Sequence, residues 1–144
     1  MSPKLFIASD HAGFDLKAHL LRMSGLSFTW EDMGPVNAER VDYPDFAQNV
    51  CRELLVAPKG SFGILVCGSG QGMAMAANRF KGIRAALTWN EESTRLSRAH
   101  NDANILCLGA RLIEPSLAVT LTEIFLRTPF EGGRHLGRVN KIDC

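Results

Sequence analysis

The chain has 144 residues, of which 46% are hydrophobic and 22% are charged. This length suits a single domain over residues 1–144, and the balance of 16 Lys and Arg against 15 Asp and Glu gives no overall attraction to nucleic acid. No apolar stretch reaches the length of a membrane span or a signal peptide, so we expect a cytoplasmic protein without a membrane partner.

Strand-like apolar runs alternate with amphipathic helical patterns along the chain. In chain order they predict a strand over 4–9, a helix over 15–23, a strand over 27–33, a helix over 44–56, a strand over 62–67, a helix over 72–80, a strand over 83–88, a helix over 91–99, a strand over 105–108 and helices over 115–127 and 134–142. Asn90 suits an N-cap, and Pro115 suits a first helical turn. Alternating order with nearly all-apolar strands predicts a three-layer α/β/α domain with a five-stranded parallel sheet, of the Rossmann-like type.

Two polar segments follow predicted strands, at the edge where such sheets bind ligands. The first is Ser9-Asp10-His11-Ala12-Gly13-Phe14 and the second is Cys67-Gly68-Ser69-Gly70-Gln71-Gly72. The glycines of the second segment allow a tight turn that directs N–H groups inward, ahead of a helix start, which predicts an anion cradle. Glycine turns of this kind also occur as plain packing joints, and no Gly-Lys-Ser or Gly-Lys-Thr indicates a nucleoside triphosphate.

The four cysteines, Cys51, Cys67, Cys107 and Cys144, are far apart without a C-x-x-C pair, so we expect free thiols rather than a zinc site or a redox dithiol. Cys67 stands at a strand end, where a helix start and inward N–H groups would stabilise a thiolate that can accept a proton. The alternative is an inert, half-buried cysteine, which is the role expected of Cys107 inside its strand.

One histidine is expected near each end of the predicted sheet. His11 follows Asp10, which could orient the imidazole or bind a sugar hydroxyl, although a loop histidine that caps the next helix is an equal alternative. His100 and Asn101 end the helix over 91–99, where an imidazolium is also favoured by the helix end alone. That helix runs back from the ligand edge, so His100 can act with Cys67 only across two subunits. A homodimer with shared sites is therefore expected.

Basic residues gather near the end of the chain. Arg134 and Arg138 are four residues apart on one helical face, and Arg111 follows the strand over 105–108. The rigid guanidinium fork matches phosphate oxygens, although a solvated basic face is the common alternative. Tyr43, in the long loop before Pro44, could close over a ligand or only pack there.

Six motifs together resemble ribose-5-phosphate isomerase type B over the whole chain. They are the two segments quoted above, Asp42-Tyr43-Pro44, Gly82-Ile83-Arg84-Ala85, His100-Asn101-Asp102-Ala103-Asn104 and Glu131-Gly132-Gly133-Arg134-His135. The broader family also includes allose 6-phosphate isomerases and the two subunits of galactose-6-phosphate isomerase. Some members use a glutamate after the glycine loop as the base, but Met73 stands there in this sequence, which leaves Cys67.

The resemblance implies a homodimer or dimer of dimers that needs neither metal nor cofactor. It implies that Cys67 moves the proton between C2 and C1, that Ser69 assists transfer between O1 and O2, and that His100 of the partner subunit opens the furanose ring with Asp10. The N–H groups of residues 68–72 would hold the enediolate. The phosphate would contact His11, Arg111, Arg134 and Arg138, and the sugar would contact Asn101 and Tyr43.

Two alternatives to a five-carbon substrate stay open from the sequence. One keeps the chemistry but takes a six-carbon sugar phosphate, such as allose 6-phosphate or galactose 6-phosphate. The other is a non-catalytic domain that binds a phosphorylated ligand, in which Cys67 is only structural.

Overall fold

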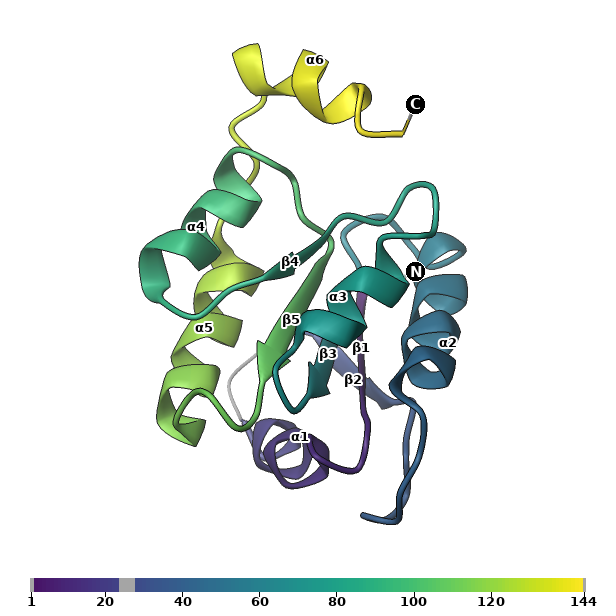
Figure 1. The fold of residues 1–144 in the computed structure, drawn as a ribbon. Helices are drawn as coiled ribbons and strands as arrows, with labels where there is room; N and C mark the ends of the chain where they lie inside the picture. Colours follow the sequence, from purple (N-terminus) through teal and green to yellow (C-terminus); the bar gives the residue numbers. More distant parts are fainter. Residues whose placement is uncertain (1, 24–27, 144) are drawn as a thin grey trace.

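The computed structural model describes residues 2–23 and 28–143, and strands alternate with helices along most of the chain (Figure 1). The strands are β1 Lys4–Ser9, β2 Thr29–Asp32, β3 Phe62–Cys67, β4 Ala85–Leu87 and β5 Ile105–Gly109; the helices are α1 Phe14–Leu21, α2 Tyr43–Leu55, α3 Gln71–Ala77, α4 Glu91–Ala99, α5 Pro115–Arg127 and α6 Arg134–Asn140. The predicted fold class is confirmed. None of the helices in the described ranges is long and apolar enough to cross a membrane.

The sheet is parallel throughout, with the strand order β2-β1-β3-β5-β4. Helices α2 and α3 cover one face, over a core that includes Leu65 and Met73, while α1 and α5 cover the other face around Leu106 and Phe125. Successive residues of a strand point to opposite faces, so β5 sends Leu106 to one core and Cys107 to the other. Burial on both faces explains why the three inner strands, β1, β3 and β5, are almost wholly apolar, whereas the edge strand β2 is largely polar.

The strand order creates a crevice between β1 and β3. The chain leaves β1 through α1 toward β2, but it leaves β3 through α3 in the opposite direction across the sheet, toward β4. Neighbouring strands whose connections diverge in this way open a ligand site beyond their carboxyl ends. The two polar segments of the sequence follow these two strands.

Helix α6 lies apart from both helical layers, at the end of the sheet opposite to the carboxyl ends of the strands and close to the end of α4 (Figure 1). The N–H of Glu131 donates to the carbonyl of Ala99 over 3.0 Å, and the N–H of Gly82 donates to Asp143 Oδ2 over 2.9 Å. These bonds attach the segments on both sides of α6 to the end where α4 finishes and β4 begins.

Several element boundaries differ from those predicted. The helices over 91–99 and 115–127 coincide with α4 and α5, and Asn90 caps α4 by accepting the Ser93 N–H over 2.8 Å. However, α3 and β4 are shorter than the predicted 72–80 and 83–88, because the Asn78 side chain ends α3 by bonding both backbone groups of Ala85, at 2.8 and 2.9 Å. The helices predicted over 44–56, 15–23 and 134–142 span Tyr43–Leu55, Phe14–Leu21 and Arg134–Asn140, and the strand over 27–33 spans Thr29–Asp32, its first predicted residue lying outside the described ranges.

Lys17 of α1 is a buried lysine with 1% of its surface exposed. Its ammonium donates to Asp32 Oδ1 over 2.7 Å and to the Pro35 carbonyl over 2.8 Å, and Asp32 also accepts the Gly34 N–H. A buried ammonium is costly without such partners. The ion pair therefore fixes the beginning of the loop that leads from β2 to Tyr43 at the ligand edge.

We expect Asp32→Asn to lower the free energy of unfolding by about 2 kcal/mol, because it leaves the Lys17 ammonium without a countercharge while keeping the shape of the side chain. Urea unfolding measures the change. The matched control is Glu31→Gln, whose partner Lys4 is 2.8 Å away in a pair that is about one-third exposed on both sides. That change should cost less than about 1 kcal/mol, and equal losses in the two variants would contradict the prediction.

Candidate active site

Cys67 is the last residue of β3, and its thiol receives a backbone hydrogen bond. The N–H of Gly70 donates to Cys67 Sγ over 3.1 Å, and only 4% of Cys67 is exposed. Gly70 has a φ of +79°, and a β-carbon there would lie 2.6 Å from a methyl group of Leu87. The left-handed turn that aims this N–H at the sulfur therefore requires glycine. The sulfur is thus held by a fixed backbone donor at the end of its strand.

Tyr43 and Asp10 line the cleft in front of Cys67. A β-carbon at Gly72 would lie 2.5 Å from the Tyr43 ring, so the ring packs directly on the backbone of the glycine segment. Asp10 is buried, and its Oδ1 accepts the N–H of Gly13 over 3.0 Å. One carboxylate oxygen is thus occupied by the turn after β1, which fixes the carboxylate toward the crevice.

Arg111 reaches the same cleft from the end of β5. Its N–H donates to the Gly68 carbonyl over 3.0 Å, and its guanidinium covers Gly68 so closely that a β-carbon there would lie 3.0 Å from it. The cleft has a volume of about 370 Å³, which is within the range that holds a small phosphorylated ligand. Its lining consists of Asp10, Tyr43, Cys67, Gly68, Ser69, Gly72, Arg111 and Leu112.

Besides Gly70, whose N–H is bonded to Cys67, two predicted ligand residues stand beside the cleft rather than in its lining. The His11 Nδ1 lies 3.3 Å from both the N–H and the carbonyl of Val41, which places the ring against the loop before α2 and not against Asp10. The described residues show no hydrogen bond between Asp10 and this ring, and Asp10 Oδ1 instead accepts the Gly13 N–H. Gln71 begins α3 with an exposed side chain, and its N–H donates to Ser69 Oγ over 3.3 Å.

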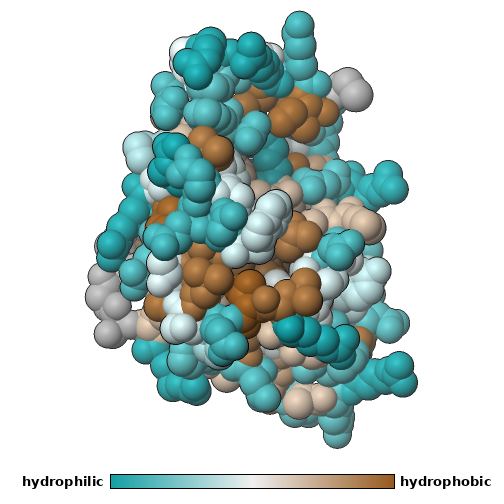
Figure 2. All heavy atoms as spheres, turned by 60° about the vertical axis from the view of Figure 1, so that its left-hand side comes forward, coloured by the Kyte–Doolittle hydropathy of each residue, from teal (hydrophilic) through white to brown (hydrophobic). Residues whose placement is uncertain are grey.

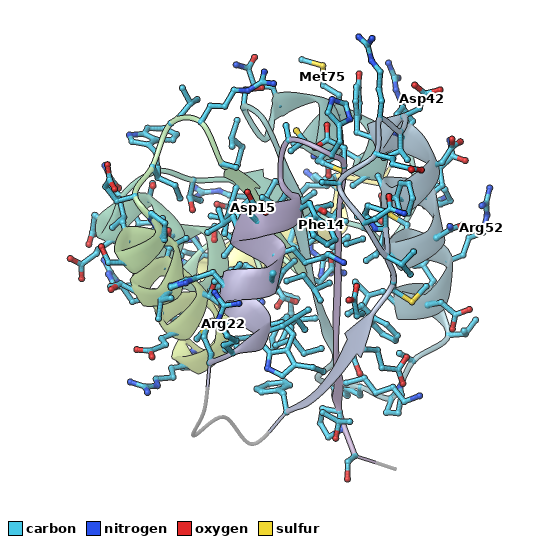
Figure 3. All side chains as sticks on the ribbon, turned by 90° about the horizontal axis from the view of Figure 1, so that it is seen from below. Phe14, Asp15, Arg22, Asp42, Arg52 and Met75 are labelled. Atoms are coloured by element: carbon cyan, nitrogen blue, oxygen red, sulfur yellow. The ribbon has the colours of Figure 1, made fainter. Side chains whose placement is uncertain are left out.

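Figure 3 shows the molecule from below, the side of the carboxyl ends of the strands, with Phe14 at the start of α1 and Asp42 at the N-cap of α2.

A larger groove, of about 640 Å³, lies between α4 and α5 and is lined by charged side chains such as Glu92, Arg95 and Arg127. It contains none of the predicted site residues.

The remaining predicted residues gather at the opposite end of the sheet. His100 and Asn101 follow α4, and Arg134 and Arg138 lie on α6 with exposed side chains. The nine residues of α4 span roughly 14 Å along the sheet. Within one chain these four residues are separated from Cys67 by the length of the strands, as the direction of the helix over 91–99 predicts.

Sequence reasoning gave no role to Glu131 and His135, although both lie in a quoted motif. The His135 ring stacks on His100 with centroids 4.1 Å apart, and Glu131 Oε1 lies 3.8 Å from His100 Nε2 and 3.6 Å from His135 Nε2. The i, i+4 spacing of Glu131 and His135 was the only available signal. These three side chains carry metal-ligand atoms within 4.8 Å of one another. However, the lone pairs of two rings only 16° from parallel lie in nearly parallel planes and do not converge on one ion.

The other described cysteines have a different environment. Burial raises the pKa of Cys51 to about 12, and complete burial raises the pKa of Cys107 well above its usual range, with Cys67 and Cys51 adding to the effect. All three thiols are free. Cys107 is thus the inert strand cysteine that the sequence predicts, and Cys67 alone of these three lines the cleft.

The fold and cleft together define a class: a Rossmann-like α/β protein with a thiol and a glycine-rich loop at the carboxyl edge of its parallel sheet. A family model described as Ribose/Galactose Isomerase matches residues 5–142. The chain therefore belongs to the Ribose/Galactose Isomerase family. This confirms the resemblance carried by the six motifs and the prediction of an enzyme.

Individual relatives are similar to this chain along nearly its whole length. Probable ribose-5-phosphate isomerase B of Mycoplasma pneumoniae is 41% identical over 99% of this chain and 94% of its own. The crystal structure of a ribose 5-phosphate isomerase from Thermotoga maritima shares 49% identity, covers 99% of both chains and has a TM-score of 0.92. The Mycoplasma genitalium ribose-5-phosphate isomerase B, solved with bound ribulose-5-phosphate, shares 41% identity over 99% of this chain and 95% of that one, with a TM-score of 0.88.

We expect iodoacetamide at pH 7 to label Cys67 at least about 100-fold faster than Cys51 or Cys107. With a pKa of about 12, the Cys51 thiol is a thiolate in only about one molecule in 10⁵ at this pH. Mass spectrometry of the labelled peptides measures the three rates, and urea-unfolded protein, in which the rates should converge, is the control. Equal rates in the folded protein would show that the Gly70 N–H does not activate Cys67.

Proposed function

We propose that the chain is a ribose-5-phosphate isomerase, which interconverts D-ribose 5-phosphate and D-ribulose 5-phosphate through a cis-enediolate. The observation that carries the proposal is the thiol of Cys67, held 3.1 Å from the Gly70 N–H in a cleft that also contains Asp10, Ser69 and Arg111. Relatives named for this activity, one of them solved with bound ribulose-5-phosphate, support the choice of substrate.

In the proposed reaction the Cys67 thiolate takes the proton from C2 of the open-chain aldose. The electron pair of the C2–H bond forms the C1–C2 double bond, and the carbonyl pair moves to O1. Ser69 assists transfer of the O2 proton to O1, after which Cys67 returns its proton to C1 and the C2 carbonyl forms. Among residues 68–72, the backbone N–H groups that do not bond Cys67 or Ser69 stabilise the negative charge, an effect that can contribute about 3 kcal/mol for one well-placed donor.

The substrate phosphate carries two negative charges and calls for several cationic donors. Arg111 stands at the cleft and His11 beside it. We assign Arg134 and Arg138 to the same phosphate and Asn101 to the sugar, together with Tyr43, which packs on Gly72. Because the α4 and α6 residues lie at the far end of the sheet, they can serve this cleft only from a second copy of the chain.

A homodimer with shared sites follows from this assignment, with a dimer of dimers as a further possible assembly. Its formation is supported by an apolar area on the face that includes β4, the edge strand (Figure 2). Met75 and Trp89 are 66% and 62% exposed, and the residues of β4 are only partly buried. Exposed apolar surface of this kind is typical of interfaces between subunits.

We expect Cys67→Ala to lower kcat for ribose 5-phosphate by roughly 10²- to 10⁴-fold, because the variant lacks the base, while the affinity for the sugar phosphate is retained. Exchange of the C2 proton with deuterated solvent and calorimetric binding measure the two effects. Cys51→Ala, which removes a thiol outside the cleft, is the control and should stay active.

Turnover that survives in Cys67→Ala would refute the role of the thiol. Wild-type protein that binds ribose 5-phosphate without exchanging its C2 proton would identify a non-catalytic binding domain instead. Progress curves with ribose 5-phosphate and allose 6-phosphate side by side test the substrate, since faster turnover of allose 6-phosphate would favour a six-carbon isomerase. A galactose-6-phosphate isomerase would be expected to need a second, different chain.

Mixing Cys67→Ala protein with His100→Asn protein should restore activity. A mixed dimer contains one site with both residues intact, so random exchange of subunits restores about a quarter of the wild-type activity. Steady-state assays before and after exchange measure the recovery, and each variant mixed with itself is the control. If subunit exchange is verified by mass and no activity returns, the sites are not built across subunits.

A further inference from the structure

His100, Glu131 and His135 form a cluster contributed by three separate segments. His100 follows α4, Glu131 lies between α5 and α6, and His135 is in the first turn of α6. The Glu131 carboxylate lies within 3.8 Å of both imidazoles, and its backbone N–H donates to Ala99, the residue before His100. His100 follows the last turn of α4. The hydrogen bond between Glu131 and Ala99 and the stacked ring of His135 hold it in place from two sides.

The two imidazoles differ in burial and in charge. His135 is 6% exposed, and its Nε2 has no hydrogen-bond partner among the described residues. Burial lowers the pKa of His135, the charges of His100, Arg134 and Arg138 lower it further, and Glu131 opposes them. His135 is therefore a neutral ring at neutral pH. His100 is about one-third exposed, so solvent and ligands can reach it.

The charge around His100 comes from more than one element. Glu131 lies beside its Nε2, and Glu92, on the first turn of α4, interacts with it electrostatically. On α6 the cationic groups are Arg134 and Arg138. The Glu131 carboxylate faces the Nε2 edge of the His100 ring at 3.8 Å, and Arg95 of α4 interacts electrostatically with Glu131. An imidazolium carries N–H groups on both nitrogens, so one can face Glu131 while the other is donated to a ligand.

Ring opening of a furanose requires such a donor. The C1–O4 bond breaks, the ring oxygen O4 takes a proton from the imidazolium, and the O1 proton passes to a carboxylate such as Asp10, so that C1 becomes the aldehyde carbonyl. We propose that Glu131 and His135 are positioning residues for His100, which hold its ring in place for proton donation to the ring oxygen. The inference rests on the proposed function, in which His100 opens the sugar ring.

Ribulose 5-phosphate provides a substrate that does not need this step. Its C5 oxygen carries the phosphate, so it cannot close a five-membered ring and is acyclic in solution. Exchange of its C1 proton with deuterated solvent therefore depends on Cys67 without ring opening. A residue that acts through His100 should affect the isomerisation of ribose 5-phosphate and spare this exchange, whereas a residue that only supports the fold affects both.

We expect Glu131→Gln to lower kcat for ribose 5-phosphate about tenfold at pH 8 with little change in KM, while C1 exchange on ribulose 5-phosphate changes less than about twofold. Glu131→Asp should restore part of the rate. The control is Glu53→Gln, an exposed glutamate on α2.

His135→Asn removes the stacked ring and should have the same selective effect. If this buried change unfolds the protein, Glu131→Gln, which alters a half-exposed side chain, carries the test alone. Equal loss of both activities, or no loss in Glu131→Gln while His100→Asn is defective, would overturn the inference and leave the proposed function standing. Full activity of His100→Asn with ribose 5-phosphate would instead overturn the ring-opening role, and the inference with it.

Discussion

The proposed base, Cys67, receives its hydrogen bond from the backbone of Gly70. In a left-handed conformation it turns the chain between β3 and α3 within three residues and points its N–H at the sulfur. Leu87 and the end of β5 lie against it so tightly that any side chain would displace them. The sheet register thus supports the thiol: β3 must pair with β5 for Gly70 to find this space, and the same pairing places Arg111 beside the cleft.

Two cysteines in neighbouring strands show how strongly position determines the surroundings of a thiol. Cys67 and Cys107 belong to the same core cluster, yet Cys107 is enclosed within β5 and Cys67 ends β3. Full burial makes the Cys107 thiolate unfavourable. At the strand end the backbone has no further partner in the sheet, and its turning N–H groups become available to an anion. The same sheet therefore holds both an enclosed thiol, Cys107, and a thiol that lines the cleft, Cys67.

The division of polar residues between the two ends of the sheet is the second constraint. Asp10, Ser69 and Arg111 meet at the carboxyl edge, whereas His100 and the arginines of α6 stand at the opposite edge. A parallel strand–helix unit always returns its helix end to the starting edge, so no local rearrangement brings the halves together. The proposed chemistry therefore needs association of two copies, in which α6, outside the two helical layers, would reach the cleft of the other copy.

Much of this could be predicted from the sequence, because the relevant physics is local. Apolar runs of strand length and helical periodicity predicted the fold class, Asn90 predicted a helix start that is confirmed by its hydrogen bond, and glycine spacing predicted the turn after Cys67. The separation of His100 from Cys67 also followed, since it depends only on helix direction and length. Contacts between distant segments were decided by tertiary structure, because they depend on how segments pack in three dimensions. The sequence pattern carries no signal for three of them: the bond of Asp10 to Gly13, the Lys17–Asp32 pair that fixes the loop before Tyr43, and the stack of His135 on His100.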